Sequence, residues 1–136
     1  MEECIFCKLI KKELPGYTIF EDEYTLAFLD IARDVDGHTI VIPKKHVVNI
    51  LDCDQETLGH VIDTVKLISN HYVNNCGYTG INLLNASGIS AQQSVPHFHF
   101  HIIPRKKEDG VDAWPKLNKS EKSLGDMHRI LQIQEN

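Results

Sequence analysis

Three histidines at alternate positions, His97, His99 and His101, are interleaved with apolar residues. Successive side chains of a β-strand point to opposite faces, so a strand over residues 95–104 would place the imidazoles on one face and the apolar side chains on the other. At a rise of about 3.3 Å per residue, neighbouring imidazoles start about 6 to 7 Å apart and can converge on one phosphate group. An imidazole titrates near neutral pH, so one ring can attack while its neighbour stabilises oxygen. The run therefore predicts a strand with one buried face and one reactive face.

Short segments rich in β-branched and aromatic residues, separated by turn-like clusters, predict the other strands. These segments are residues 17–21, 25–31, 38–43 and 80–86. Apolar residues recur at helical spacing from Leu58 to Tyr72, after Asp54 as an N-cap and before Gly77 as a stop. A shorter helix is expected over residues 5–12. The order predicts an α+β fold, an antiparallel sheet of about five strands with one long helix and one short N-terminal helix, the helices on one side of the sheet.

Length and composition limit the organisation and the partners. The 136 residues, 42% of them hydrophobic, predict a single domain over residues 1–136, with 106–136 as a C-terminal tail whose order the sequence does not define. A net charge of -5 argues against nucleic acid as the main partner. No stretch approaches the roughly 18 apolar residues of a membrane span. The N-terminal segment lacks the apolar run of a secretory signal, so we expect reduced cysteines and a cytoplasmic location.

The histidine run has two ordinary alternative explanations. A single histidine on a strand is usually a surface residue or a satisfied core residue. Three on one face in strict alternation fit that explanation poorly. A metal site is the other explanation, because histidine is the commonest metal ligand. Three alternate positions on a straight strand splay apart, so at most one or two of these rings reach the same ion at about 2.1 Å.

Several segments together resemble the histidine triad (HIT) family, and specifically its Hint-type branch. They are CIFCKLIKKELP, TLAFLDI, HTIVIPKKHV and NAS...QQSVPHFHFHIIPR, which together span about residues 4 to 105. The resemblance implies a nucleotide hydrolase or transferase, often a homodimer, in which the middle histidine, His99, forms a covalent nucleotidyl intermediate. It implies a purine nucleotide as the common half of the substrate, either a nucleoside phosphoramidate or a dinucleoside polyphosphate, with no organic cofactor.

The same resemblance assigns catalytic roles to matching residues. His101 would contact the α-phosphate and stabilise the pentavalent transition state. Gln93 and Ser94 would donate hydrogen bonds to phosphate oxygens or to the leaving group, as preorganised donors do. Asn85 would lie on the phosphate side. One position departs from the family pattern, because Gln92 replaces a glycine that would permit a positive φ or a close backbone approach.

The nucleoside half is assigned to a second set of residues. Asp30 would hold the ribose hydroxyls, which suits a two-oxygen acceptor, and His38 would support the triad. The slot for the base would be formed by four apolar residues, Phe6, Leu9, Phe28 and Ile31. Ordinary core packing explains these four equally well.

The pair Cys4 and Cys7 raises the possibility of a metal. A closed structural zinc site needs four ligands, and the resemblance to zinc-containing bacterial members supplies His46 and His97. This assignment implies one structural Zn²⁺ and leaves the other two triad histidines for catalysis. A redox pair or plain buried cysteines would explain Cys4 and Cys7 by themselves.

Two rival functions remain open from the sequence. A non-catalytic nucleotide-binding or scaffolding protein would use the same pocket for affinity alone. A zinc-dependent hydrolase would attack with a metal-bound water, and would lose all turnover when the metal is removed.

Overall fold

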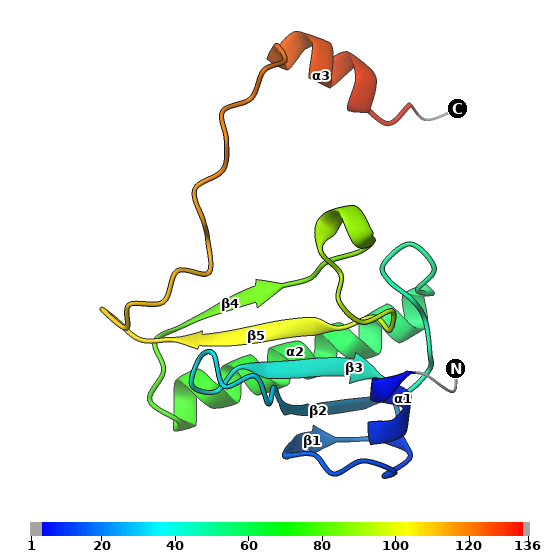
Figure 1. Cartoon of the computed structure of the whole chain (residues 1–136), viewed down its shortest axis with the longest axis vertical. Helices are drawn as coiled ribbons and strands as arrows, with labels where there is room; N and C mark the ends of the chain where they lie inside the picture. The colour runs from blue at the N-terminus through cyan, green and yellow to red at the C-terminus, as the bar shows by residue number, and fades with distance from the viewer. Residues whose placement is uncertain (1–3, 135–136) are drawn as a thin grey trace.

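A computed structural model describes residues 4–134 and shows one antiparallel five-stranded sheet, covered by a long helix and a short N-terminal helix, with a C-terminal helix that stands away from it (Figure 1). The elements in chain order are α1 (Ile5–Ile10), β1 (Thr18–Glu21), β2 (Thr25–Leu29), β3 (Thr39–Pro43), α2 (Gln55–Asn75), β4 (Gly80–Leu84), a 3-10 turn η1 (Ile89–Ala91), β5 (Phe100–Arg105) and α3 (Leu124–Leu131). The strands lie in the order β1-β2-β3-β5-β4. The predicted α+β fold is confirmed.

The long helix α2 has an N-cap, a glycine just after its C-terminus and an apolar stripe, and all three favour a helix over the same residues. The Asp54 side chain accepts a hydrogen bond from the Thr57 amide and caps the N-terminus. Gly77, just beyond the C-cap, has a φ of 84° that glycine adopts without strain. The buried stripe of α2 packs on one face of the sheet with Ala27, Val41, Val47, Phe98 and Ile102. Within residues 4–134, no helix combines the length and apolarity needed to cross a bilayer.

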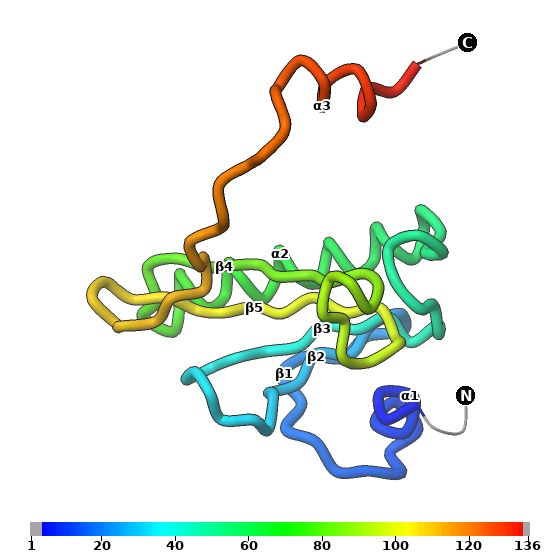
Figure 2. Tube along the Cα trace, turned by 45° about the horizontal axis from the view of Figure 1, so that its top comes forward, coloured from blue at the N-terminus to red at the C-terminus, as the bar shows by residue number. Residues whose placement is uncertain are grey.

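The expectation that the helices lie on one side of the sheet is wrong. Figure 2 shows α1 on the face opposite α2. The reason lies in β2, where Ala27 faces α2 while Leu26 and Phe28 face the Phe6 side chain of α1. Strand β3 divides its buried residues in the same way. Because these two central strands are apolar on both faces, each face needs a cover.

The last strand is shorter than predicted, because β5 begins at Phe100 and leaves 95–99 outside it. Pro96 has no amide hydrogen to donate, and the Phe98 amide donates to the Val47 carbonyl instead of to a neighbouring strand. The alternation of faces nevertheless holds. Phe98 is buried against α2, whereas the rings of His97 and His99 contact Phe6 on the other face.

Other element boundaries differ from the prediction by a few residues. Strand β2 ends at Leu29, where the Asp30 carboxylate accepts from the Ala32 amide and turns the chain. Strand β4 ends at Leu84 and α1 ends at Ile10, so both are two residues shorter than expected. The existence and type of each of these elements were predicted correctly.

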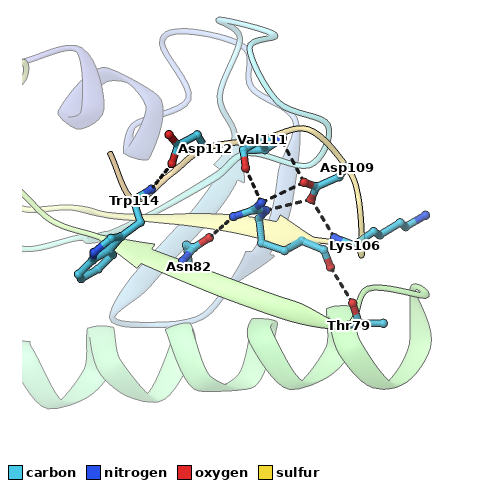
Figure 3. A network of polar contacts seen from close by, with 8 residues as sticks. Thr79, Asn82, Lys106, Asp109, Val111, Asp112 and Trp114 are labelled. Carbon is cyan, nitrogen blue, oxygen red and sulfur yellow. Dashed lines mark hydrogen bonds and ion pairs between the residues drawn. The ribbon is translucent and has the colours of Figure 1, made fainter. Parts of the chain in front are cut away.

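The C-terminal segment is fixed at its root by Arg105, the last residue of β5 (Figure 3). Its guanidinium donates to the Asp109 carboxylate, to the Asn82 side-chain oxygen and to the Val111 carbonyl. The chain then extends away from the sheet and ends in α3, whose N-cap is Ser123 (Figure 1). Arg105 therefore holds the first residues of the tail, up to Val111, against the sheet.

Gln92 has a left-handed backbone, with a φ of 70° and a ψ of 31°. This is the position where the family pattern has glycine, and a Cβ in this conformation costs about 1–2 kcal/mol. The greater freedom of glycine in the unfolded chain offsets about 0.5–1 kcal/mol of that cost. We expect Gln92→Gly to raise the free energy of unfolding by about 0.5–1 kcal/mol, measured by urea denaturation.

The matched control for this substitution is Gln92→Ala, which removes the side chain but keeps the Cβ. Its free energy of unfolding should stay close to that of the wild type. A Gln92→Gly variant less stable than Gln92→Ala would show that this position carries no backbone strain.

Candidate active site

A pocket of about 560 Å³ opens beside the histidine run, between α1, the ends of β2 and β3, and the loop before β5. Eight of the predicted site residues line it, namely Phe6, Leu9, Phe28, Asp30, Ile31, Ser94, His99 and His101. Seven further lining residues were not predicted, namely Ile5, Leu14, Pro15, Gly16, Leu29, Ile40 and Val95. The walls are mainly apolar, while the imidazoles, a carboxylate and a hydroxyl supply the polar groups. This composition suits a ligand with a flat apolar part and an anionic part.

His99 is held in one tautomer. Its Nδ1 lies 2.7 Å from the His97 carbonyl oxygen, which can only accept, so Nδ1 carries the proton and donates it. Nε2 of the neutral ring therefore holds the lone pair. Burial lowers the pKa of His99, which keeps the ring neutral near pH 7. The side chain is buried and lines the pocket, so the structure provides a neutral ring nitrogen with a lone pair there.

His101 stands next to this ring, with the two ring centroids 4.9 Å apart. Burial, followed by the neighbouring His99 and His38 rings, lowers the pKa of His101 to about 4. His101 Nδ1 lies 2.9 Å from His38 Nε2. The Asp30 carboxylate is 3.7 Å from the same His38 nitrogen, too far for a hydrogen bond. His38 is buried and contacts His101, and its predicted role in supporting the triad stays a prediction.

Asp34 completes this group and was missed from the sequence. Its carboxylate oxygen lies 2.8 Å from His38 Nδ1. That hydrogen bond from His38 lowers the pKa of Asp34, which is therefore ionised at neutral pH. Asp34 stands in the cluster Asp34-Val35-Asp36-Gly37, which the sequence indicated only as a turn. The four-residue spacing from His38 was the available signal.

Two predicted phosphate-side residues lie outside the pocket lining. Asn85 donates through Nδ2 to the His99 carbonyl at 2.8 Å, so it holds the backbone of His99. Gln93 donates from Nε2 to the Val48 and Val95 carbonyls, at 2.7 and 2.9 Å. Both amide hydrogens of Gln93 are thus committed, and the expected donation from Gln93 to phosphate is not what this structure shows. Gln93 joins the loop before β5 to the loop after β3.

The four predicted metal ligands lie together, with their ligand atoms within 4.8 Å of one another. Cys4 Sγ is 3.3 Å from His97 Nδ1, Cys7 Sγ is 3.3 Å from His46 Nδ1, and the two imidazole nitrogens are 3.1 Å apart. A tetrahedral zinc with ordinary bond lengths has ligand-to-ligand edges of about 3.3 to 3.8 Å, close to these values. His97 Nε2 donates to the Pro43 carbonyl at 2.8 Å, which leaves Nδ1 free to ligate.

The chemistry of this cluster also fits a cation. Burial, aided by Cys4, raises the pKa of the Cys7 thiol to about 11. A bound divalent cation reverses that effect, because a coordinating thiol is deprotonated outright. All four cysteines of the chain are free thiols. Two thiols and two imidazoles therefore form a donor set of the kind that zinc prefers.

Comparison with known proteins decides the family. A family model described as the HIT domain matches residues 11–108. The chain belongs to the HIT family. A relative named "Uncharacterized HIT-like protein" from Borreliella burgdorferi is 49% identical over 112 residues, covering 81% of both chains. The adenosine 5'-monophosphoramidase HNT1 of Saccharomyces cerevisiae is 35% identical, over 94% of this chain and 80% of the yeast protein.

Solved structures of HIT proteins agree with the fold. A HIT family member from Bacillus subtilis superposes with a TM-score of 0.81 at 39% identity, covering 94% of this chain and 92% of that one. A Zn-bound histidine triad family protein from Mycobacterium smegmatis gives a TM-score of 0.78 at 31% identity, covering 86% and 85%. The resemblance inferred from the sequence is thus confirmed at the level of the HIT family.

Proposed function

We propose that this HIT protein cleaves nucleoside phosphoramidates or dinucleoside polyphosphates at the α-phosphorus through a covalent nucleotidyl-His99 intermediate. The observation that carries the proposal is the hydrogen bond from His99 Nδ1 to the His97 carbonyl, because it leaves Nε2 as a neutral nucleophile in the pocket. A relative named as an adenosine 5'-monophosphoramidase supports a phosphoramidate substrate.

The pocket offers a place for each part of such a nucleotide. The purine base would lie in the apolar slot formed by Phe6, Leu9, Phe28 and Ile31. The Asp30 carboxylate would accept hydrogen bonds from the ribose hydroxyls, since its Oδ2 is not the oxygen that binds the Ala32 amide. Ser94, exposed at the pocket edge, would donate to a phosphate oxygen.

The reaction would proceed in two displacements. His99 Nε2 forms a bond to the α-phosphorus while the P–N bond to the amine breaks. The departing nitrogen keeps that electron pair and takes a proton from His101 Nε2. Water then attacks the phosphorus, returns a proton to His101, and the P–Nε2 bond breaks to restore neutral His99. Dividing one displacement into two lowers each barrier.

We further propose a structural zinc on Cys4, Cys7, His46 and His97, as in zinc-containing members of the Hint-type branch. The donor set described above and the Zn-bound relative support it. A homodimer, a cytoplasmic location and a single domain with residues 106–136 as its tail also belong to the proposal. In this account the metal holds α1 against the loop before β5, and the reaction itself runs through the histidines.

The proposal predicts an adduct that can be captured. We expect rapid mixing with adenosine 5'-phosphoramidate, followed by an alkaline quench, to add one adenylyl group to the intact protein mass. The adduct should map to the peptide that carries His99 and be absent from His99→Asn. Dinucleoside polyphosphates in the same assay would show which leaving group is preferred. Nucleotide binding with neither adduct nor turnover would instead support the non-catalytic binding protein.

A further inference from the structure

We propose that Asp34 is a positioning residue for the reaction. Through His38 it fixes the tautomer of His101, so that the His101 nitrogen facing the ligand gains a proton when an anionic nucleotide binds. This inference rests on the proposed function, because it concerns the proton that His101 supplies. Asp34 itself does not line the pocket, and its side chain is 53% exposed.

The first step follows from the Asp34 carboxylate. An ionised carboxylate can only accept hydrogen bonds, so at 2.8 Å from Asp34 the His38 Nδ1 must carry a proton. In the neutral ring His38 Nε2 then carries a lone pair. Asp34 thereby makes the other ring nitrogen, His38 Nε2, a hydrogen-bond acceptor.

The second step concerns the contact between the two imidazoles. His38 Nε2 lies 2.9 Å from His101 Nδ1, and such a contact needs one proton between the two nitrogens. Since His38 Nε2 accepts, His101 Nδ1 donates. The remaining nitrogen, His101 Nε2, therefore has a lone pair in the ligand-free protein, and His101 lines the pocket.

The third step is the protonation of His101 by ligand binding. The low pKa of His101 keeps the free ring neutral at pH 7. The charged or titratable groups that face it are Asp30, Asp34, His38 and His99. A phosphate anion beside His101 adds to the two carboxylates, Asp30 and Asp34, that favour the imidazolium. The proton that enters on Nε2 is the one that the leaving amine later takes.

Charge and geometry at Asp34 can be separated by two substitutions. Asp34→Asn keeps a side-chain oxygen that accepts from His38 Nδ1 but removes the charge. Asp34→Ala removes both. Asp36→Asn is the matched control, because Asp36 is exposed on the same loop and, among residues 4–134, makes no hydrogen bond to either imidazole. Both positions are exposed, so all three variants should fold.

The experiment measures the ¹⁵N shifts of the His101 ring, free and with AMP at pH 7, alongside kcat and KM. We expect wild-type His101 to be protonated only at Nδ1 when free and at both nitrogens with AMP. Asp34→Ala should lose the Nδ1 preference and the AMP-dependent proton, and lower kcat by about 10- to 100-fold with KM within about threefold. Asp34→Asn should keep the free tautomer but lose much of the second protonation.

Two results would overturn the role of Asp34. One is a wild-type His101 that carries its proton on Nε2 when free, and the other is an Asp34→Ala protein with the ring shifts and kcat of the wild type. Either can occur while the nucleotidyl-His99 adduct still forms, which would leave the proposed function standing. An absent adduct with the expected ring shifts would instead contradict the proposed function alone.

Discussion

Replacing His99 with alanine should lower kcat for adenosine 5'-phosphoramidate by about 10⁴-fold or more, the scale seen when a nucleophile is removed. The buried ring supplies the attacking atom in the proposed first displacement, while His101 supplies the proton that the leaving amine takes. His99→Asn keeps a polar side chain in place of the ring. It provides a second variant if the cavity left by alanine destabilises the fold. Turnover is measured by product chromatography.

The binding step serves as the internal reference for this prediction. AMP should still bind to either His99 variant with a Kd within about tenfold of the wild-type value, because the base slot and Asp30 are unchanged. His71→Ala is the matched control, since His71 is exposed on α2 and away from the pocket. Normal turnover by a folded His99 variant that binds AMP would refute the nucleophile. Loss of turnover in the His71 control would show that the activity loss is not specific to substitutions in the pocket.

The face that each side chain occupies was predictable from the sequence. The alternation of histidine and apolar residues correctly placed Phe98 against α2 and His99 on the opposite face. The boundary of the strand was not predictable, because it depends on which carbonyl receives each amide hydrogen. The Phe98 amide pairs with Val47, which lies about fifty positions earlier in the chain. Side-chain period is local information, whereas backbone pairing is decided by the tertiary fold.

The position of α1 shows the same limit. Residues 5–12 correctly indicated a short helix, but the prediction that it would pack on the same side of the sheet as the long helix was wrong. The side on which α1 packs depends on Leu26 and Phe28, whose burial was visible only as general hydrophobicity of β2. The lining residues Leu14 and Pro15 were missed for a related reason, since they reach the pocket only because α1 packs there.

The residues that could be predicted from the sequence are those whose own side chains line the pocket. Asp30 and His99 line the pocket as expected. For Gln93 the predicted donation to phosphate stays a prediction, because here the amide donates to the Val48 and Val95 carbonyls of two loops that the sequence does not bring together. Asp34 was missed because its role passes through His38. Residues that act through another residue leave no pattern in the sequence apart from spacing.

Removing the proposed zinc should produce the largest change in stability. We expect wild-type protein purified without added metal to contain about one zinc per chain, and Cys4→Ala or Cys7→Ala to contain less than about a tenth of that. The melting temperature of each variant should fall by about 10 °C, which corresponds to a loss of about 3 kcal/mol at this chain length. The loss is smaller than in a zinc finger, because this fold has its own apolar core.

The cysteines outside the cluster provide the matched control. Cys53→Ala and Cys76→Ala should keep the zinc and nearly the wild-type melting temperature, because neither thiol is near the cluster. A wild-type protein that is free of metal while all four thiols remain titratable would contradict the site.

Chelation separates a structural zinc from a catalytic one. The metal would hold His97, whose carbonyl accepts the proton of His99 Nδ1, so its removal should loosen the nucleophile without removing it. Below the melting temperature of the metal-free protein, we therefore expect kcat to stay within about tenfold of the wild-type value. Complete loss of turnover in protein that remains folded would instead point to attack by a metal-bound water. Chelation can separate the two because His97 has two roles in the proposal. Its backbone oxygen accepts the hydrogen bond from His99, and its ring would bind the zinc.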